Sequence, residues 1–450
     1  MKILMLELRQ VLHSRLAVGA VVLLTLLSAL SVWTGLQAVS QQRAALERTA
    51  ASHAQDHAAI AAKQLKGGPA QAGSVGYYLP HLTVNPPSAL AFVAIGQRDL
   101  QPQALRVRLL GLHSQLYESE TINPELAMPG RFDFAFVLVF LAPLFVIALM
   151  HDLVTGEREA GRLRLLASLP AGAADTWRRR VGLRFGLLWL AALLPVACGA
   201  LVAGAGINGF GAIALVATLY LAFWFGLAGW LAARARTSSS SAAILLACLV
   251  GLTMILPTLA DAAIARLSPV SKGVELALAQ RQAVHSGWDI PKPETFARFF
   301  QTHPEWKDTA PVVGRFHWKW YYAMHQAGDQ AVADDVAQYR AGMAARDTWT
   351  ARVGLLLASV NVQVLLHRLA DTDLAAQLAY QDRIAAYHTQ LREFFYPYLF
   401  NEQPFTQADL AKLPMYEAGV STGTLPLGQV LALALMAAVI MLVGLRKLRT

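Results

Sequence analysis

Six long apolar runs limit what this chain can fold into more than any other feature of its sequence. An apolar helix of about 20 residues crosses a hydrocarbon core of about 30 Å, and lipid forces a crossing segment to bond its own backbone. The composition agrees, because 55% of the residues are hydrophobic and 15% are charged. The sequence therefore predicts a mainly α-helical integral membrane protein with six transmembrane helices. We place them at residues 16–37, 132–150, 181–203, 211–233, 238–260 and 427–445.

Basic residues give these spans an orientation. An even number of spans puts both termini on one side, and positively charged loops stay in the cytoplasm. The two terminal segments and the loops on their side of the spans hold 15 basic and 5 acidic residues, whereas the rest holds 23 and 24. Both termini are therefore predicted to be cytoplasmic. The net charge of +9 thus comes entirely from the segments predicted to be cytoplasmic, where basic residues set the membrane orientation. We therefore expect no nucleic-acid partner.

The first fifteen residues form a separate element before the first span. Leu4, Leu8, Val11 and Leu12 share one helical face, and the basic side chains lie largely away from it. This pattern predicts an amphipathic helix, residues 1–15, at the cytosolic membrane surface. A cleaved signal peptide is disfavoured, because the apolar run that follows is too long and no clear cleavage site follows it.

Two large segments, 38–131 and 261–424, lie on the opposite side. The first opens with an alanine-rich helical stretch that ends near Gly67 and prolongs the first span. The second is mostly helical in pattern, notably around Leu378, Ile384 and Leu391. Both cysteines, Cys198 and Cys248, fall inside apolar runs, so no disulfide supports these segments. We expect the two insertions to form one large, mostly helical extracytoplasmic domain.

The cytosolic loop at 151–180 carries the sequence's most distinctive stretch, GEREAGRLRLLASLP, at residues 156–170. Leu163 and Leu166, with Ala167 and Leu169, make an apolar stripe beside charged residues, and Pro170 ends the helical pattern. The pattern predicts a short helix that docks onto a soluble partner. The alternative is that its arginines only fix the membrane orientation.

The sequence lacks the common nucleotide-binding, zinc and redox motifs. It has no G-x-x-x-x-G-K-[ST] phosphate loop, no H-E-x-x-H and no C-x-x-C. The pattern G-x-S-x-G occurs once, as GVSTG at residues 419–423, in a turn-like stretch just before the last apolar run. The chain is therefore expected to be a non-catalytic subunit without a cofactor or metal of its own. His53 and His57, spaced i and i+4, leave metal binding open as a weak alternative. Pro143, Pro195 and Pro257 lie in or near span interiors and can bend their helices.

Three stretches resemble bacterial ABC-2 type transporter permeases of the branch that carries the domain DUF3526. The cytosolic stretch is similar to that superfamily's coupling segment at Glu157, Glu159, Gly161, Leu163 and Pro170. Two further matches are INPELAMPGRFDFAF, which leads into the second span, and the later stretches FFYPYLF and LPMYE. The resemblance covers nearly the whole chain.

The resemblance implies a permease of the bacterial inner membrane that pairs with a second permease chain, identical or homologous. It also implies two copies of a separate ABC ATPase, which would bind ATP and push on the cytosolic helix. Glu157, Glu159, Gly161, Leu163 and Leu166 are the expected ATPase contacts, assisted by Glu7 and Arg9 on the amphipathic helix. Export is the expected direction.

A second hypothesis is a membrane-anchored sensor or envelope assembly protein whose extracytoplasmic domain binds a ligand. The size of that domain motivates it. Such a protein would usually have fewer spans and a cytosolic output domain, and this sequence offers neither. A membrane enzyme is a weaker third hypothesis, because no nucleophile, base and metal occur together in the pattern.

Overall fold

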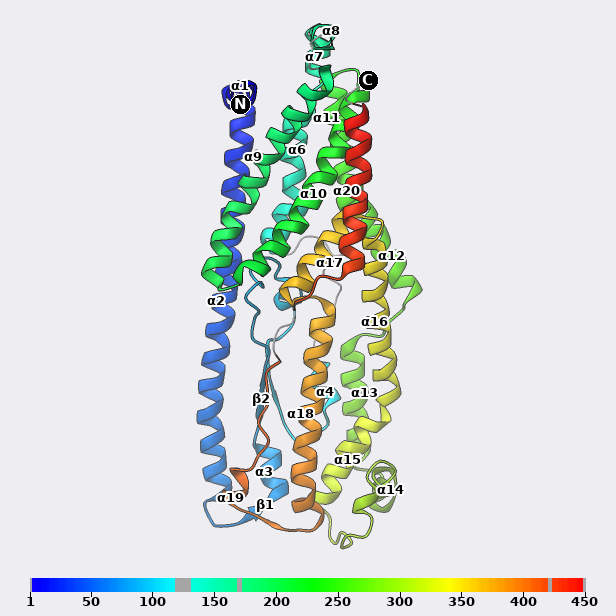
Figure 1. Ribbon diagram of the computed structural model, residues 1–450. Coiled ribbons are helices and arrows are strands. Elements are labelled where there is room, and N and C mark those ends of the chain that lie inside the picture. The colour runs from blue at the N-terminus through cyan, green and yellow to red at the C-terminus, as the bar shows by residue number, and fades with distance from the viewer. Residues whose placement is uncertain (1, 118–130, 168–171, 420–422, 448–450) are drawn as a thin grey trace.

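The computed structural model describes residues 2–117, 131–167, 172–419 and 423–447. It is elongated, with a bundle of helices at one end and a second helical body at the other (Figure 1). We call these the membrane bundle and the large domain. The N-terminal helix and the last helix end at the same extremity of the bundle, which we call the terminal end (Figure 1).

The described residues include six helical segments long and apolar enough to cross a membrane, which confirms the predicted fold class. The elements of the bundle are α1 (Lys2–His13), α2 (Arg15–Leu65), α5 (Phe134–Phe136), η2 (Val137–Leu141), α6 (Ala142–Met150), α7 (Thr155–Glu159), α8 (Leu163–Ala167), α9 (Gly172–Ala203), α10 (Gly206–Arg234), α11 (Ser238–Val250), η3 (Gly251–Ile255), α12 (Leu256–Leu267) and α20 (Leu427–Lys447).

Two spans contain π-helical turns just before a proline. The turn η2 precedes Pro143 and η3 precedes Pro257. Proline lacks the N–H that would bond the carbonyl four residues earlier, so the helix must rearrange locally and a carbonyl needs another donor. Hydroxyl groups from neighbouring helices supply it: Tyr220 donates to the carbonyl of Val139 at 2.9 Å, and Ser359 donates to that of Leu252 at 2.6 Å.

The large domain is built from both insertions, as predicted. Strand β1 of the first insertion pairs with β4 of the second, with Ala70 opposite Phe405. One apolar core contains side chains from both, such as Val75 and Leu109 with Tyr322 and Phe395. Its elements are β1 (Ala70–Gln71), α3 (Ala72–Tyr78), β2 (His81–Val84), η1 (Gly96–Asp99), β3 (Ala104–Val107), α4 (His113–Leu116), α13 (Gly273–Ser286), α14 (Lys292–Phe299), η4 (Pro304–Trp306), α15 (Trp318–Ala331), α16 (Ala333–Gly354), α17 (Ala358–Ala370), α18 (Leu374–Phe400), β4 (Pro404–Phe405) and α19 (Gln407–Leu410).

Three elements join the two bodies. Helix α2 runs without interruption from the bundle along the large domain, as the alanine-rich stretch predicted (Figure 1). The loop at residues 91–95 is buried, and the Phe92 ring packs against Val32 and Gly199 of the bundle. Helix α17 contributes Val362, Leu365 and Leu366 to the core of the bundle. The segment 261–424, predicted as wholly extracytoplasmic, therefore includes one helix that packs among the spans.

Candidate coupling site

The stretch at 156–170, which was predicted to be cytosolic, is not the single helix that its pattern predicted. The structure divides it into α7 and α8, which form the tip of the terminal end (Figure 1). The break lies at Gly161, whose φ of +70° is a conformation that glycine adopts without steric cost. The helical spacing of apolar residues continues across Gly161, so the sequence pattern did not reveal this break. Leu169 and Pro170 lie outside the described residues.

An arginine on α9 holds α7 against the first helix. The Arg180 guanidinium lies 2.9 Å from one carboxylate oxygen of Glu157 and 3.1 Å from the carboxylate of Glu7 on α1. All three side chains are between 12% and 14% exposed. Partly buried pairs of this kind are screened less by salt than surface pairs. The Arg180 bridge, as we call these three residues, therefore ties α1, α7 and α9 together.

Further hydrogen bonds tie α7 to the fourth and fifth spans. The Arg158 guanidinium donates to the carbonyls of Ala233 and Ala235 at the end of α10, where the helix dipole favours a cation. The Glu159 carboxylate accepts the backbone N–H of Ser238 at 2.8 Å and its hydroxyl at 3.0 Å, at the start of α11. Together with the Arg180 bridge, these bonds connect α7 to α1, α9, α10 and α11.

Helix α8 rests on the bundle through its leucines. Leu163 and Leu166 are partly buried against the core of the bundle, whereas Leu165 is 66% exposed. These two leucines of the predicted apolar stripe thus face the bundle, and the outward surface of α8 differs from the one that the sequence pattern selected.

The other predicted contact residues differ in how accessible they are. Arg9 and Gly161 are exposed at the terminal end. Glu159 is exposed and bonded to Ser238, whereas Glu157 and Glu7 are mostly covered within the Arg180 bridge. The structure thus brings Glu7, Glu157 and Glu159 into one region with α7.

Sequence reasoning missed the partners of these carboxylates. Arg180 lies at the end of the predicted loop 151–180, and Ser238 is the first residue of the predicted fifth span, but neither was predicted to bond these carboxylates. Ser238 begins α11, whose preceding residue Thr237 caps the helix by accepting the N–H of Ser240. The signal that could have found Ser238 is the cap pattern, a threonine before a long apolar helix.

Two models of protein families match the chain in complementary regions. Residues 1–175 match the ABC-2 family transporter protein model, and residues 274–418 match the domain of unknown function DUF3526. This chain is an ABC-2 family transporter permease with a DUF3526 domain. No curated protein and no solved structure matches the permease significantly. The ABC-2 match includes α7 and α8, and the DUF3526 match covers most of the second insertion.

The histidine pair has a third neighbour in the permease. The rings of His53 and His57 are 5.7 Å apart, and that of His81 is 6.4 Å from His57. Among the described residues, however, no group of three or more histidine, cysteine, aspartate or glutamate side chains could hold a metal ion. These histidines therefore give no support to the metal alternative.

Proposed function

We propose that the permease is the membrane subunit of an ABC exporter in the bacterial inner membrane. In this proposal the terminal end is cytoplasmic, and two copies of a separate ABC ATPase dock there. A second permease chain, identical or homologous, completes the pathway. The permease itself binds no ATP and needs no cofactor. The family supports an ATPase partner in general, and the surplus of basic residues supports the orientation.

One observation carries the coupling part of this proposal. The short segment α7 lies at the tip of the terminal end, and polar side chains tie it to α1, α9, α10 and α11. A partner that moves α7 would move three spans and the amphipathic helix with it. Exposed Arg9 and the outward surface of α8 offer the contact, while Glu157, Glu159 and Glu7 pass the displacement on.

The test is an affinity purification of the tagged permease from cells that express the ATPase, followed by an assay of ATP hydrolysis. We expect an ATPase to co-purify with the wild-type permease. The double variant Glu157→Arg with Glu159→Arg should either lose the ATPase or fail to stimulate its ATP hydrolysis. Glu157 pairs with Arg180 within the permease, so its charge reversal acts by releasing α7 from α1 and α9. A resulting loss of about 1.4 kcal/mol in docking would reduce ATPase binding tenfold. Arg315→Glu, an exposed change in the large domain, is the matched control.

A thermal unfolding midpoint for each purified variant separates docking from folding. If the double variant keeps the wild-type midpoint and also retains the ATPase and its activity, the coupling assignment is wrong. A stable wild-type complex without any ATPase would instead favour the sensor or assembly hypothesis.

A further inference from the structure

A groove of about 530 Å³ lies in the large domain, far from the coupling site. One wall is the outer half of α2, including Ile60, and the other is the segment that follows β3, including Arg108 and Leu110. The groove is also lined by Tyr78, Arg106 and His325. Nothing in the coupling proposal uses this groove.

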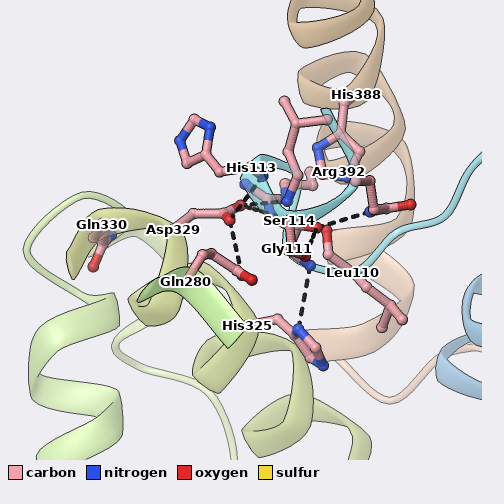
Figure 2. Close-up of polar contacts among 12 residues, drawn as sticks. Leu110, Gly111, His113, Ser114, Gln280, His325, Asp329, Gln330, His388 and Arg392 are labelled. Carbon is pink, nitrogen blue, oxygen red and sulfur yellow. Dashed lines mark hydrogen bonds and ion pairs between the residues drawn. The ribbon is translucent and has the colours of Figure 1, made fainter. Parts of the chain in front are cut away.

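A buried polar cluster fixes the wall formed by residues 108–113 (Figure 2). The Asp329 carboxylate accepts the N–H of Leu112 at 2.9 Å, an amide N–H of Gln280 at 3.1 Å and the Arg392 guanidinium at 2.6 Å. Burial alone would raise the pKa of Asp329. The Arg392 charge nevertheless holds that pKa below its usual range, with help from His113 and the Leu112 N–H, so the carboxylate stays ionised.

The same cluster holds the backbone on both sides of Leu109. Arg392 donates to the carbonyl of Leu110 at 3.3 Å, and the His388 ring donates to the carbonyl of Arg108 at 3.0 Å. A wall fixed by buried hydrogen bonds loses little conformational entropy when a ligand binds. The groove is therefore preorganised and does not depend on its occupant for its shape.

His325 presents a hydrogen-bond donor without an acceptor. Its Nδ1 accepts the N–H of Gly111 at 3.2 Å, so in the neutral ring the proton is on Nε2. Burial lowers the pKa of His325 to about 4, so the ring is neutral at pH 7. The Nε2 atom is buried and has no hydrogen-bond partner among the described residues. Buried donors without partners are rare and often mark a ligand position.

The two arginines of the groove differ in their partners. Arg106 forms an ion pair with Asp56 on α2 at 2.8 Å. Arg108 is exposed, and no ion pair or hydrogen bond of its guanidinium occurs within the described part of the chain. A free guanidinium and an unused N–H donor on residues that line one groove suit a carboxylate or a phosphate, since both accept several such bonds. Ile60, Tyr78 and Leu110 supply apolar surface beside them.

We propose that this groove binds an organic anion, a carboxylate or phosphate joined to an apolar body. Arg108 pairs with the acidic group, which the Nε2–H of His325 also reaches, and the apolar body lies along Ile60, Tyr78 and Leu110. The proposal goes beyond the transport function, and it holds whether the ligand is cargo or a regulator.

Calorimetric titration of the full-length permease in a neutral maltoside detergent tests this site. Hexyl phosphate is the probe, and inorganic phosphate and hexanol each carry one half of its chemistry. We expect saturable binding of one hexyl phosphate per chain, at least tenfold weaker binding of inorganic phosphate, and none of hexanol. Arg108→Ala should weaken the binding of hexyl phosphate at least tenfold, and Arg315→Ala should leave its affinity unchanged.

Two outcomes would overturn the proposal. One is hexyl phosphate binding that Arg108→Ala leaves unchanged, which would assign the heat to the micelle or to another surface. The other is an absence of saturable binding to a wild-type sample with an intact thermal transition. Equal affinity for inorganic phosphate would contradict the apolar half of the site. These measurements need no ATPase, so a negative result would contradict the groove proposal without bearing on the coupling proposal.

Discussion

At the scale of single residues, a glycine decides how closely the large domain approaches the bundle. A Cβ atom on Gly35 of α2 would lie 2.1 Å from the carbonyl oxygen of Phe92. That oxygen belongs to the backbone of the buried loop 91–95, so it cannot rotate away as a flexible side chain would. The close approach places the Phe92 ring against Gly199 of α9. Gly35 is thus required by contact with a distant segment.

We therefore predict that Gly35→Ala destabilises the protein by about 1–3 kcal/mol, the usual cost of overpacking. The matched control is Gly19→Ala on the same helix, where an added Cβ meets nothing within 4 Å. That change should be neutral or slightly stabilising, because alanine has the better helix propensity. Thermal unfolding followed by tryptophan fluorescence measures both. Equal midpoints for the two variants would contradict the close approach.

At the scale of elements, the π turns η2 and η3 depend on hydroxyl groups from other helices. The carbonyls of Val139 and Leu252 lie inside their spans, and each accepts a hydroxyl from α10 or α17. A buried carbonyl that loses its hydrogen-bond donor destabilises the folded state by the full free energy of its removal from water. The π turns before Pro143 and Pro257 are therefore held by tertiary contacts in addition to the prolines.

Tyr220→Phe and Ser359→Ala should each lower stability by about 1–3 kcal/mol, since each leaves a buried carbonyl without its hydroxyl donor. Thr258→Val is the control, because among the described residues that hydroxyl bonds only the carbonyl of Met254 in its own helix. It should change stability by no more than about 0.5 kcal/mol. Unfolding midpoints in detergent measure all three. If Tyr220→Phe behaves like the control, the hydroxyl does not support the π turn.

At the scale of the whole molecule, the two insertions share one core, so the stability of the large domain depends on groups from both. His81 belongs to the first insertion, and His325 and His388 belong to the second. Burial lowers the pKa of His81 to about 3, that of His325 to about 4 and that of His388 to about 3. All three are neutral in the folded protein near pH 6, whereas the unfolded chain begins to bind protons at about pH 6.5.

The sign of the pH dependence follows from these pKa values. Below about pH 6.5 the unfolded state binds more protons than the folded state, so stability falls as the pH falls toward 4. Each histidine contributes at most about 1.4 kcal/mol per pH unit. We expect the unfolding midpoint to decrease steadily between pH 7 and pH 5. His388→Gln should give a shallower decrease, and exposed His285→Gln should not; a flat profile would contradict the burial of these rings.

The sequence by itself determined the features that depend on local composition. Apolar runs of spanning length specify six transmembrane helices because lipid cannot satisfy an open backbone. The alanine-rich stretch determined the continuation of α2, and the two long insertions indicated one large helical domain. The stretch around Glu157 identified the region where α7 and α8 lie, and its motif indicated the family.

Only the tertiary structure decided which side chains meet. Arg180 is 23 residues from Glu157 and 173 from Glu7, so no local spacing links them. The insertion of α17 among the spans depends on packing with α10 and α20, which periodicity cannot reveal. The groove beside Arg108 exists because Asp329 and Arg392, from two other helices, hold its wall. Contacts between distant segments are chosen by complementary shape and charge in three dimensions, and a linear pattern carries neither.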